Sequence, residues 1–340
     1  MDKLTIKTLA KELQLSVSTI SKALRDSHEI SAETKRKVLA LAEQLNYSPN
    51  PYASSLRKRK SKTIGVVIPE VVNSFFSQSI NGIESVAKEK GYHVLIYLTH
   101  ENLENEKAIL KDFENGRVDG VLLSVSRETI NSQHITGLID KDVPVIFFDR
   151  VFNEVATVKV ITNDFESAYI ATKHLIQCGC KNPHFLSITG NLNIISNRIE
   201  GYKKALEEHQ IKFSSNNLIN CTTNWEYNYA LLLKKLKAAK KPDGILCSIE
   251  NLSVLIYKVC EDLKIEIPED LQIISFSNLD TASFLNPPLT TITQPAYEIG
   301  KAAAATLVRA LDKKNFVVPN ENIIIPSALI KRKSTKNKVS

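Results

Sequence analysis

Residues 5–24, TIKTLAKELQLSVSTISKAL, combine hydroxyl and ammonium side chains with an apolar repeat. A first helix is predicted because apolar residues recur at helical spacing, at Ile6, Leu9, Ala10 and Leu13. A second helix would begin after Ser16, whose hydroxyl can accept a backbone N–H of the first turn. It would bury Ile20, Ala23 and Leu24 and leave Val17, Ser18, Ser21, Lys22 and Arg25 free for other contacts.

Two short helices with this spacing match the helix-turn-helix, whose second helix enters the DNA major groove. The alternative is a helical hairpin that only packs against another part of the chain.

The distribution of charge favours the helix-turn-helix. The chain has 44 Lys and Arg against 37 Asp and Glu, and residues 1–62 hold 13 of the basic and 6 of the acidic side chains. The whole net charge of +7 therefore lies in this segment, as attraction to DNA phosphates requires.

Length and composition limit the class of protein. A chain of 340 residues is expected to form two or three domains. No apolar run reaches 18 residues, and the N-terminal MDKLTIKTLAKELQ lacks the apolar segment of a secretion signal, so we expect a cytoplasmic protein. The cysteines lack zinc-finger or C-x-x-C spacing and are expected to be free thiols, at Cys178, Cys180, Cys221, Cys247 and Cys260.

A third helix is predicted to start at Ser31 and to end before Asn46-Tyr47-Ser48-Pro49, which completes a helical head over residues 1–49. Residues 50–62 follow as a hinge, NPYASSLRKRKSK, in which Leu56 is the one strongly apolar side chain after Tyr52. The segment resembles a flexible linker, because a helix of one or two turns over ASSLRK would be marginal in water by itself. Such a segment can order on binding DNA.

From Thr63 the pattern changes to buried strands that alternate with amphipathic helices. Strands are predicted at 63–68, 93–98, 120–123, 143–148 and 158–162, and the alternation then restarts with helix 167–177 and strand 184–189. This pattern predicts an α/β core of doubly wound parallel sheets in two lobes with a cleft between them. We assign residues 63–162 and 293–320 to the first lobe, 163–292 and 321–332 to the second, and 333–340 to a basic tail.

Taken as a whole, the chain resembles the lactose-repressor/galactose-repressor family of bacterial transcription regulators. The resemblance rests on TIKTLAKELQLSVSTISKAL, ISAETKRKVLALAEQLNYSPNPYASSLR, TIGVVIPEVVNSFF, RVDGVLLS, PVIFFDR, TNDFESAYIATKHLI, NRIEGYKKAL and NPPLTTITQP, which occur in the family's order. It implies a helix-turn-helix head, a core like that of periplasmic binding proteins, and a ligand-responsive regulator, a repressor by expectation. Its partners would be a pseudo-palindromic operator, a second copy of the chain and a small-molecule effector.

The resemblance implies that Val17, Ser18 and Lys22 face base edges. The family usually has Arg at the Lys22 position, and Lys binds guanine as a point charge without the rigid fork of Arg. Leu56 lies where the family inserts a leucine wedge into the minor groove, and a lone apolar side chain in a basic segment suits that role. Packing of Leu56 on the core is the alternative. The full expected DNA-contact set is Thr5, Ser16, Val17, Ser18, Thr19, Ser21, Lys22, Asn50, Ala53, Leu56, Arg57 and Lys58.

An effector is expected in the cleft, where strand ends place aromatic and charged side chains together. Aromatic faces can stack on a sugar ring and charged groups can bind its hydroxyls, so a carbohydrate or a derivative is expected. A structural ion pair of Asp149 with Arg150, and aromatic residues that only fill the core, are the alternative. The expected effector contacts are Phe75, Phe76, Asp149, Arg150, Arg198, Trp225, Ser277 and Gln294.

The sequence also departs from the family pattern. Ile249-Glu250 stands where members often have Asn-Asp, and Ser277-Asn278 where they often have Asp-Asp, so two usual polar ligand contacts are altered. The C-terminal KRKSTKNKVS has no leucine heptads, which favours a dimer over a tetramer.

Two other classes of protein are disfavoured by the sequence. An enzyme is disfavoured because the chain has no G-x-G-x-x-G, no G-x-x-x-x-G-K-[ST] and no G-x-S-x-G motif, and its seven His have no metal-ligand spacing. No cofactor or metal is expected. A transporter's solute-binding protein would share the two-lobed core, but it needs a secretion signal and has no use for a basic helix-turn-helix.

Overall fold

The computed structural model describes residues 5–47, 61–190, 192–313 and 318–336. The chain divides into two compact units, Met1–Ser61 and Lys62–Ser340. The expected contacts Asn50, Ala53, Leu56, Arg57 and Lys58 lie outside the described residues.

The N-terminal unit is a bundle of three helices: α1 (Ile6–Glu12), α2 (Val17–Ala23) and α3 (Ala32–Gln44). Its centre is formed by Leu9, Ile20, Ala23 and Val38, which are buried. The predicted cap Ser16 is confirmed, and Ser31, the predicted start of the third helix, is the N-cap of α3. The Ser16 hydroxyl accepts the backbone N–H of Thr19 at 3.0 Å, and the hydroxyl of Ser31 accepts that of Thr34 at 3.3 Å.

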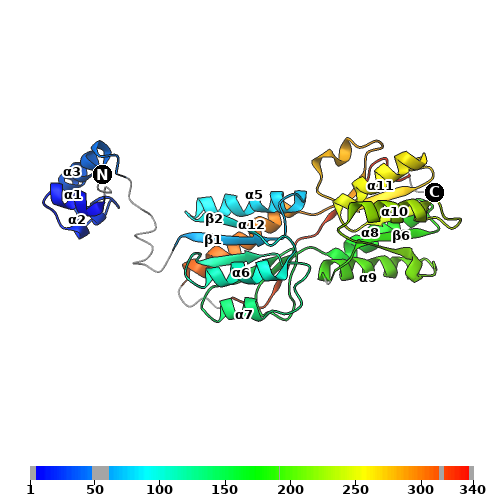
Figure 1. The fold of residues 1–340 in the computed structure, drawn as a ribbon, viewed down its shortest axis with the longest axis horizontal. Coiled ribbons are helices and arrows are strands. Elements are labelled where there is room, and N and C mark those ends of the chain that lie inside the picture. Colours follow the sequence, from blue (N-terminus) through cyan, green and yellow to red (C-terminus); the bar gives the residue numbers. More distant parts are fainter. Residues whose placement is uncertain (1–4, 48–60, 191, 314–317, 337–340) are drawn as a thin grey trace. The chain divides into compact units, whose positions relative to one another are not determined.

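The second unit contains two lobes, each built on a six-stranded sheet (Figure 1). In the first lobe the strand order is β11-β5-β4-β3-β1-β2, and all neighbours are parallel. Helices α5 and α12 cover one face and α6 and α7 the other. The elements are β1 (Thr63–Ile68), α5 (Ser74–Glu89), β2 (His93–Leu98), α6 (Leu103–Phe113), β3 (Gly120–Leu123), α7 (Gln133–Ile139), β4 (Val145–Phe148), β5 (Lys159–Ile161), α12 (Ala296–Asp312) and β11 (Asn322–Ile324).

In the second lobe the order is β12-β10-β9-β8-β6-β7, with β12 antiparallel to β10 and the other neighbours parallel. Helices α8 and α9 cover one face, and α10 and α11 the other. The elements are α8 (Asp164–Gln177), β6 (Pro183–Ile188), α9 (Asn193–Glu208), η1 (Ser215–Asn217), β7 (Leu218–Cys221), α10 (Trp225–Leu236), β8 (Gly244–Cys247), α11 (Glu250–Leu263), β9 (Gln272–Phe276), η2 (Asp280–Ser283), β10 (Thr290–Thr293) and β12 (Ala328–Ile330).

Two of the expected lobe boundaries are wrong. Residues 321–324 were assigned to the second lobe, but β11 pairs with β5 in the first, and the chain crosses to the second lobe only before β12. Residues 333–336 are not part of a free tail, because Ser334 and Thr335 are buried. The Ser334 hydroxyl donates to the Ile273 carbonyl at 2.6 Å, so this segment is held against β9.

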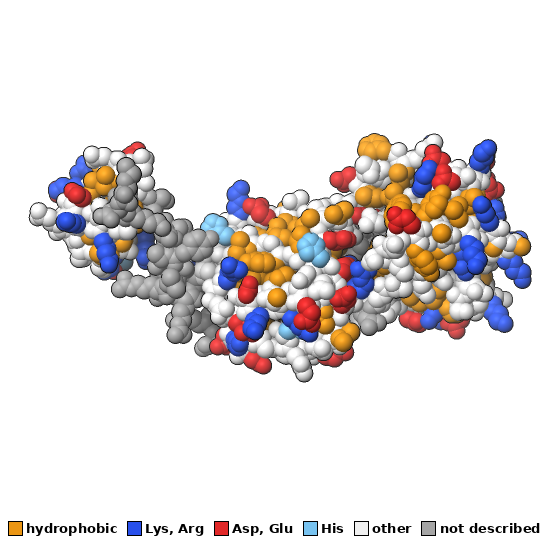
Figure 2. Space-filling view, viewed as in Figure 1, with side chains coloured by type: hydrophobic (Ala, Val, Ile, Leu, Met, Phe, Trp, Pro, Cys, Tyr) orange, Lys and Arg blue, Asp and Glu red, His pale blue; other side chains and the backbone are white. Residues whose placement is uncertain are grey.

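The surface of the second unit carries charges of both signs. On the face shown in Figure 2, basic and acidic side chains are interspersed over both lobes. The residues after 62 have no net charge, so this mixed pattern is expected. None of the described helices combines the length and the apolar character that a bilayer crossing requires.

Candidate functional sites

Helix α2 presents the residues that were expected to contact DNA. Val17 is 42% exposed, Ser18 and Lys22 are exposed, and Thr19 and Ser21 are half-buried. Lys22 forms an ion pair with Glu29, and Arg25 donates to the Ser21 hydroxyl at 3.1 Å. Thr5 precedes α1 and is exposed, and Ser16 caps α2.

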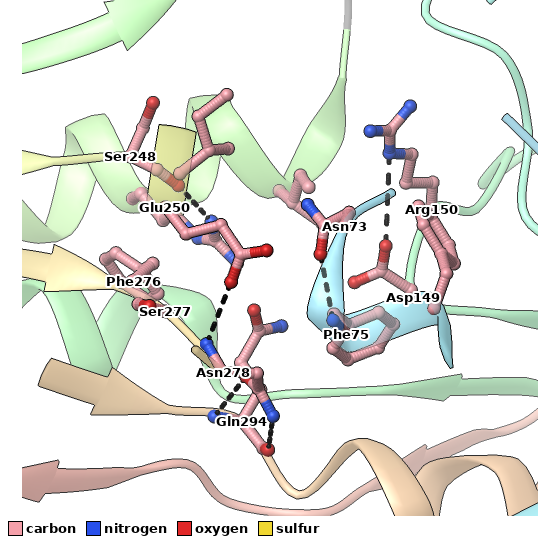
Figure 3. Close-up of a pocket in the computed structure, with 14 residues that line it drawn as sticks. Asn73, Phe75, Asp149, Arg150, Ser248, Glu250, Phe276, Ser277, Asn278 and Gln294 are labelled. Atoms are coloured by element: carbon pink, nitrogen blue, oxygen red, sulfur yellow. Dashed lines mark hydrogen bonds and ion pairs between the residues drawn. The ribbon is translucent and has the colours of Figure 1, made fainter. Parts of the chain in front are cut away.

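In the second unit, a small pocket lies where strands of both lobes end (Figure 3). Carboxyl ends of parallel strands are the usual place for a ligand in such sheets. The lining comes from the segments that follow β1 and β4 in the first lobe and β8, β9 and β10 in the second, with α9 beside them. It consists of Asn73, Phe75, Phe76, Asp149, Arg150, Ile194, Arg198, Ser248, Ile249, Glu250, Phe276, Ser277, Asn278 and Gln294.

Asp149 directly follows β4 and has a left-handed backbone, with φ of +60°. Such conformations are uncommon outside Gly and are concentrated at functional sites. The side chain is buried, and burial raises the pKa of its carboxyl to about 6 against the opposing charges of Arg150 and Arg198. The nearest cation is the Arg150 Nε, 3.9 Å from its Oδ2. Near neutral pH this carboxyl can therefore exchange between its charged and neutral forms.

Arg150 is held by Glu101 on the loop after β2. Its Nη1 donates to both Glu101 oxygens, at 2.8 and 3.0 Å. Glu101 also accepts the backbone N–H of Arg127 at 2.9 Å. Burial opposes ionisation of Glu101, but these two arginines more than offset it and hold its pKa below the ordinary value. Arg150 is thereby held in place with its Nε directed toward Asp149 (Figure 3).

Arg198 on α9 is 2% exposed and is bound inside the second lobe. Its Nε donates to Asp164 Oδ1 at 2.7 Å, its Nη1 donates to the Ser248 carbonyl at 2.6 Å, and its guanidinium lies over the Phe276 ring at 3.8 Å. Burial raises the pKa of Asp164 in spite of the arginine beside it. Arg198 therefore supports the pocket wall and shares one face with the cavity.

The two lobes are joined across the pocket by hydrogen bonds of Glu250 and Asn278. Glu250 accepts the backbone N–H of Ser74 at 2.7 Å, and Asn278 and Gln78 exchange bonds of 2.9 and 3.1 Å. Asn278 Nδ2 also donates to the Gln294 carbonyl at 2.7 Å (Figure 3). These contacts link the two lobes beside a cavity of about 30 Å³, enough for about two water molecules.

Within the described part of the chain, three buried polar atoms of residues that line this cavity have no hydrogen-bond partner: Arg150 Nε, Ser248 Oγ and Gln294 Nε2. Leaving such groups unpaired costs free energy, and water or a ligand usually satisfies them. A second pocket of about 270 Å³ adjoins the first and shares Asn73, Arg150, Ile194 and Ile249 with it.

The structure brings seven of the eight expected effector residues together at the small pocket. Trp225 is the exception, because it lines the adjoining pocket and is 46% exposed. Asn73, Glu250 and Asn278 are site residues that were not among the expected contacts. Asn73 caps α5, Glu250 is the first residue of α11, and Asn278 lies two residues after β9. For Glu250 and Asn278, the departures from the family pattern at 249–250 and 277–278 were the feature of the sequence that could have indicated a role at the site.

Comparison with known proteins identifies the class. Residues 5–50 match the family of bacterial regulatory proteins named the lacI family, and residues 172–335 match the periplasmic binding protein-like domain. The chain is 31% identical over 320 residues to the ribose operon repressor of Haemophilus influenzae, covering 94% of this chain and 93% of that protein. It is 30% identical over 336 residues to catabolite control protein A of Staphylococcus epidermidis, covering 98% and 99%.

The chain therefore belongs to the lacI family of bacterial regulatory proteins, which are DNA-binding transcription regulators. Its fold matches the Lac repressor dimer bound to operator and the anti-inducer ONPF, with a TM-score of 0.85, 21% identity and coverage of 99% of this chain and 100% of that one. A LacI family regulator from Enterococcus faecium with bound ribose matches with a TM-score of 0.70 and 28% identity, covering 81% and 98%.

Proposed function

We propose that this protein is a ligand-responsive repressor that binds a pseudo-palindromic operator as a homodimer and holds a carbohydrate or a carbohydrate derivative between its core lobes. The observation that carries the proposal is the set of unpartnered polar atoms at the cavity between the lobes, in a chain with a helix-turn-helix head. The protein would act in the cytoplasm and would not be an enzyme.

In this proposal α2 enters the major groove with Val17, Ser18 and Lys22 toward the base edges. Thr5, Ser16, Thr19 and Ser21 would contact the backbone, since hydroxyls commonly donate to phosphate oxygens. The hinge would add Asn50, Ala53, Arg57 and Lys58, with Leu56 as a wedge in the minor groove. A homodimer is supported by the Lac repressor, which was solved as a dimer on its operator.

For the effector, the cavity offers donors from Arg150 and Gln294 and an acceptor from Asp149, which is the set that a ring with several hydroxyls needs. Phe75 and Phe76 form the apolar floor, and Arg198, Ser277 and Trp225 complete the expected contacts. Related regulators have been solved with ribose and with cellobiose. The cavity is smaller than a sugar, so the effector would enter while the lobes are apart.

A gel-shift titration tests this function. The full chain should bind the DNA upstream of its own gene, and a chain truncated to residues 62–340 should not, because the basic helices are removed. A panel of sugars should then release or strengthen the binding. Ligand binding without any DNA binding would contradict the proposal and favour a solute-binding protein.

A further inference from the structure

Glu250 is the first residue of α11, and its carboxylate reaches the start of α5 in the other lobe. The side chain is 3% exposed. Its Oε1 accepts the backbone N–H of Ser74 at 2.7 Å, and its Oε2 accepts that of Asn278 at 3.2 Å. Ser74 is the first residue of α5, a helix of 16 residues, so the carboxylate lies at the positive end of that helix dipole.

The next N–H groups of the same turn also have partners. Phe75 donates to Asn73 Oδ1 at 2.9 Å, and Phe76 donates to the Asn73 carbonyl at 3.0 Å. A helix N-terminus that faces a pocket is a ready site for a phosphate or a carboxylate. In this chain the carboxylate of Glu250 already occupies the position that the anion of a ligand would take.

The cations of the pocket are compensated as well. Arg150 is paired with Glu101, and Arg198 with Asp164. The lining holds two further carboxyl groups, those of Asp149 and Glu250. Each of these two arginines of the described lining already has a carboxylate partner. A bound anion would have to replace that partner. An anionic ligand would lie beside like charges in a site with little water, which is costly.

We infer that Glu250 is a specificity-determining residue that makes the pocket reject anionic effectors and select an uncharged polyol. This inference rests on the proposed function, since it assigns the chemical class of the effector at the same pocket. An uncharged ring leaves Glu250 on α5 and bonds to the Arg150 Nε and the Ser248 Oγ, which have no hydrogen-bond partner among the described residues. A phosphate ester would have to displace Glu250 from Ser74 or lie against it.

Removal of the Glu250 carboxylate should create a binding site for an anion. If Glu250 only stabilised the fold, its removal would not create such a site. Inorganic phosphate is titrated into the full-length chain by calorimetry at pH 7.5 and constant ionic strength. Glu250→Ala should bind phosphate at least fivefold more tightly than the wild type. Glu250→Gln should stay near the wild type, because its amide oxygen can still accept the Ser74 N–H.

Two controls show whether a gain in phosphate binding comes from the N–H groups that Glu250 leaves vacant or only from the loss of a negative charge. Glu70→Gln removes a carboxyl from the adjoining pocket and should gain no phosphate binding. The double variant Glu250→Ala with Ser74→Pro should lose the gain, since proline is tolerated at the first helical position but has no N–H. If Glu250→Ala lacks the wild-type circular dichroism, Glu250→Ser takes its place.

In a second arm, the wild type is titrated with D-ribose and ribose 5-phosphate and with D-glucose and glucose 6-phosphate. A phosphate affinity of Glu250→Ala within twofold of the wild type would overturn the inference. So would a wild type that binds either phosphate ester more tightly than its parent sugar, and in that case the proposed function would still stand. Failure of the proposed function would show separately, as a full chain that binds no DNA.

Discussion

At the residue scale, Asp149 combines a strained backbone with a carboxyl that burial keeps partly neutral. Its pKa is about 6 in the folded chain and 3.8 in ordinary surroundings. The folded state therefore binds more protons between these values, and the free energy of unfolding should fall as the pH rises through that window. The shift corresponds to about 3 kcal/mol at most.

Asp149→Asn removes this titration. The variant should match the wild type near pH 4 and be more stable by about 1–3 kcal/mol at pH 7, because the wild type alone must then keep a charged carboxylate buried. Urea unfolding of both chains at the two pH values measures the difference, and other titrating groups cancel in the comparison. An equal stability difference at both pH values would show that burial of Asp149 does not shift its pKa.

The ion pair of Arg198 with Asp164 is a contact that could not be predicted from the sequence. Arg198 was expected among the effector contacts, and its position at the pocket follows from the helix that carries it. Its pairing with Asp164 was not foreseen, because the two residues are 34 positions apart and meet only when α8 packs on α9. Glu250 was likewise noted only as a departure from a pattern, since its partner Ser74 belongs to the other lobe.

At the element scale, α5 and α12 approach closely at two glycines. A Cβ on Gly300 would lie 2.0 Å from the carbonyl oxygen of Ser79, and one on Gly82 would lie 2.1 Å from that of Tyr297. Backbone atoms cannot move aside as a flexible side chain does, so the helices would have to separate. Both helices pack on one face of the first lobe's sheet and form part of its core. A separation of the helices would therefore loosen that core.

Gly300→Ala should therefore destabilise the second unit by about 1–3 kcal/mol or more. Gly137→Ala is the matched control, because Gly137 lies inside α7 with open space around its Cβ position. There alanine should be neutral or should stabilise by about 0.5–1 kcal/mol, as expected for a helix interior. Thermal unfolding of residues 62–340 compares the two, and equal melting temperatures would contradict the close approach of α5 and α12.

The alternation of strands and helices was predictable at this scale because buried parallel strands leave strong apolar runs, as in VPVIFF before Asp149. Three short strands, β7, β10 and β12, were not predicted. β7 (LINC) and β10 (TTIT) mix polar with apolar residues, and β12 (ALI) has only three residues, so none of them leaves a continuous apolar run. The same shortness explains the error at β11, since three residues, Asn-Ile-Ile, do not reveal which sheet they join.

At the scale of the whole molecule, function depends on two units with different charge. The segment 1–62 carries the entire excess of positive charge, and the remainder is neutral, with both signs mixed on the face shown in Figure 2. Binding of DNA should therefore be a property of the first unit, and recognition of the effector a property of the second. The effector can control DNA binding if it prefers one arrangement of the lobes over another.

Salt dependence of DNA binding tests this division most directly. Fluorescence anisotropy gives the affinity of the full chain for the DNA upstream of its gene at several salt concentrations. If each head of a dimer neutralises several phosphates, the plot of log affinity against log salt should fall with a slope of about −4 or steeper. A chain that lacks residues 1–61 should show no measurable binding. A flat slope for the full chain, or equal binding by the truncated chain, would contradict the account.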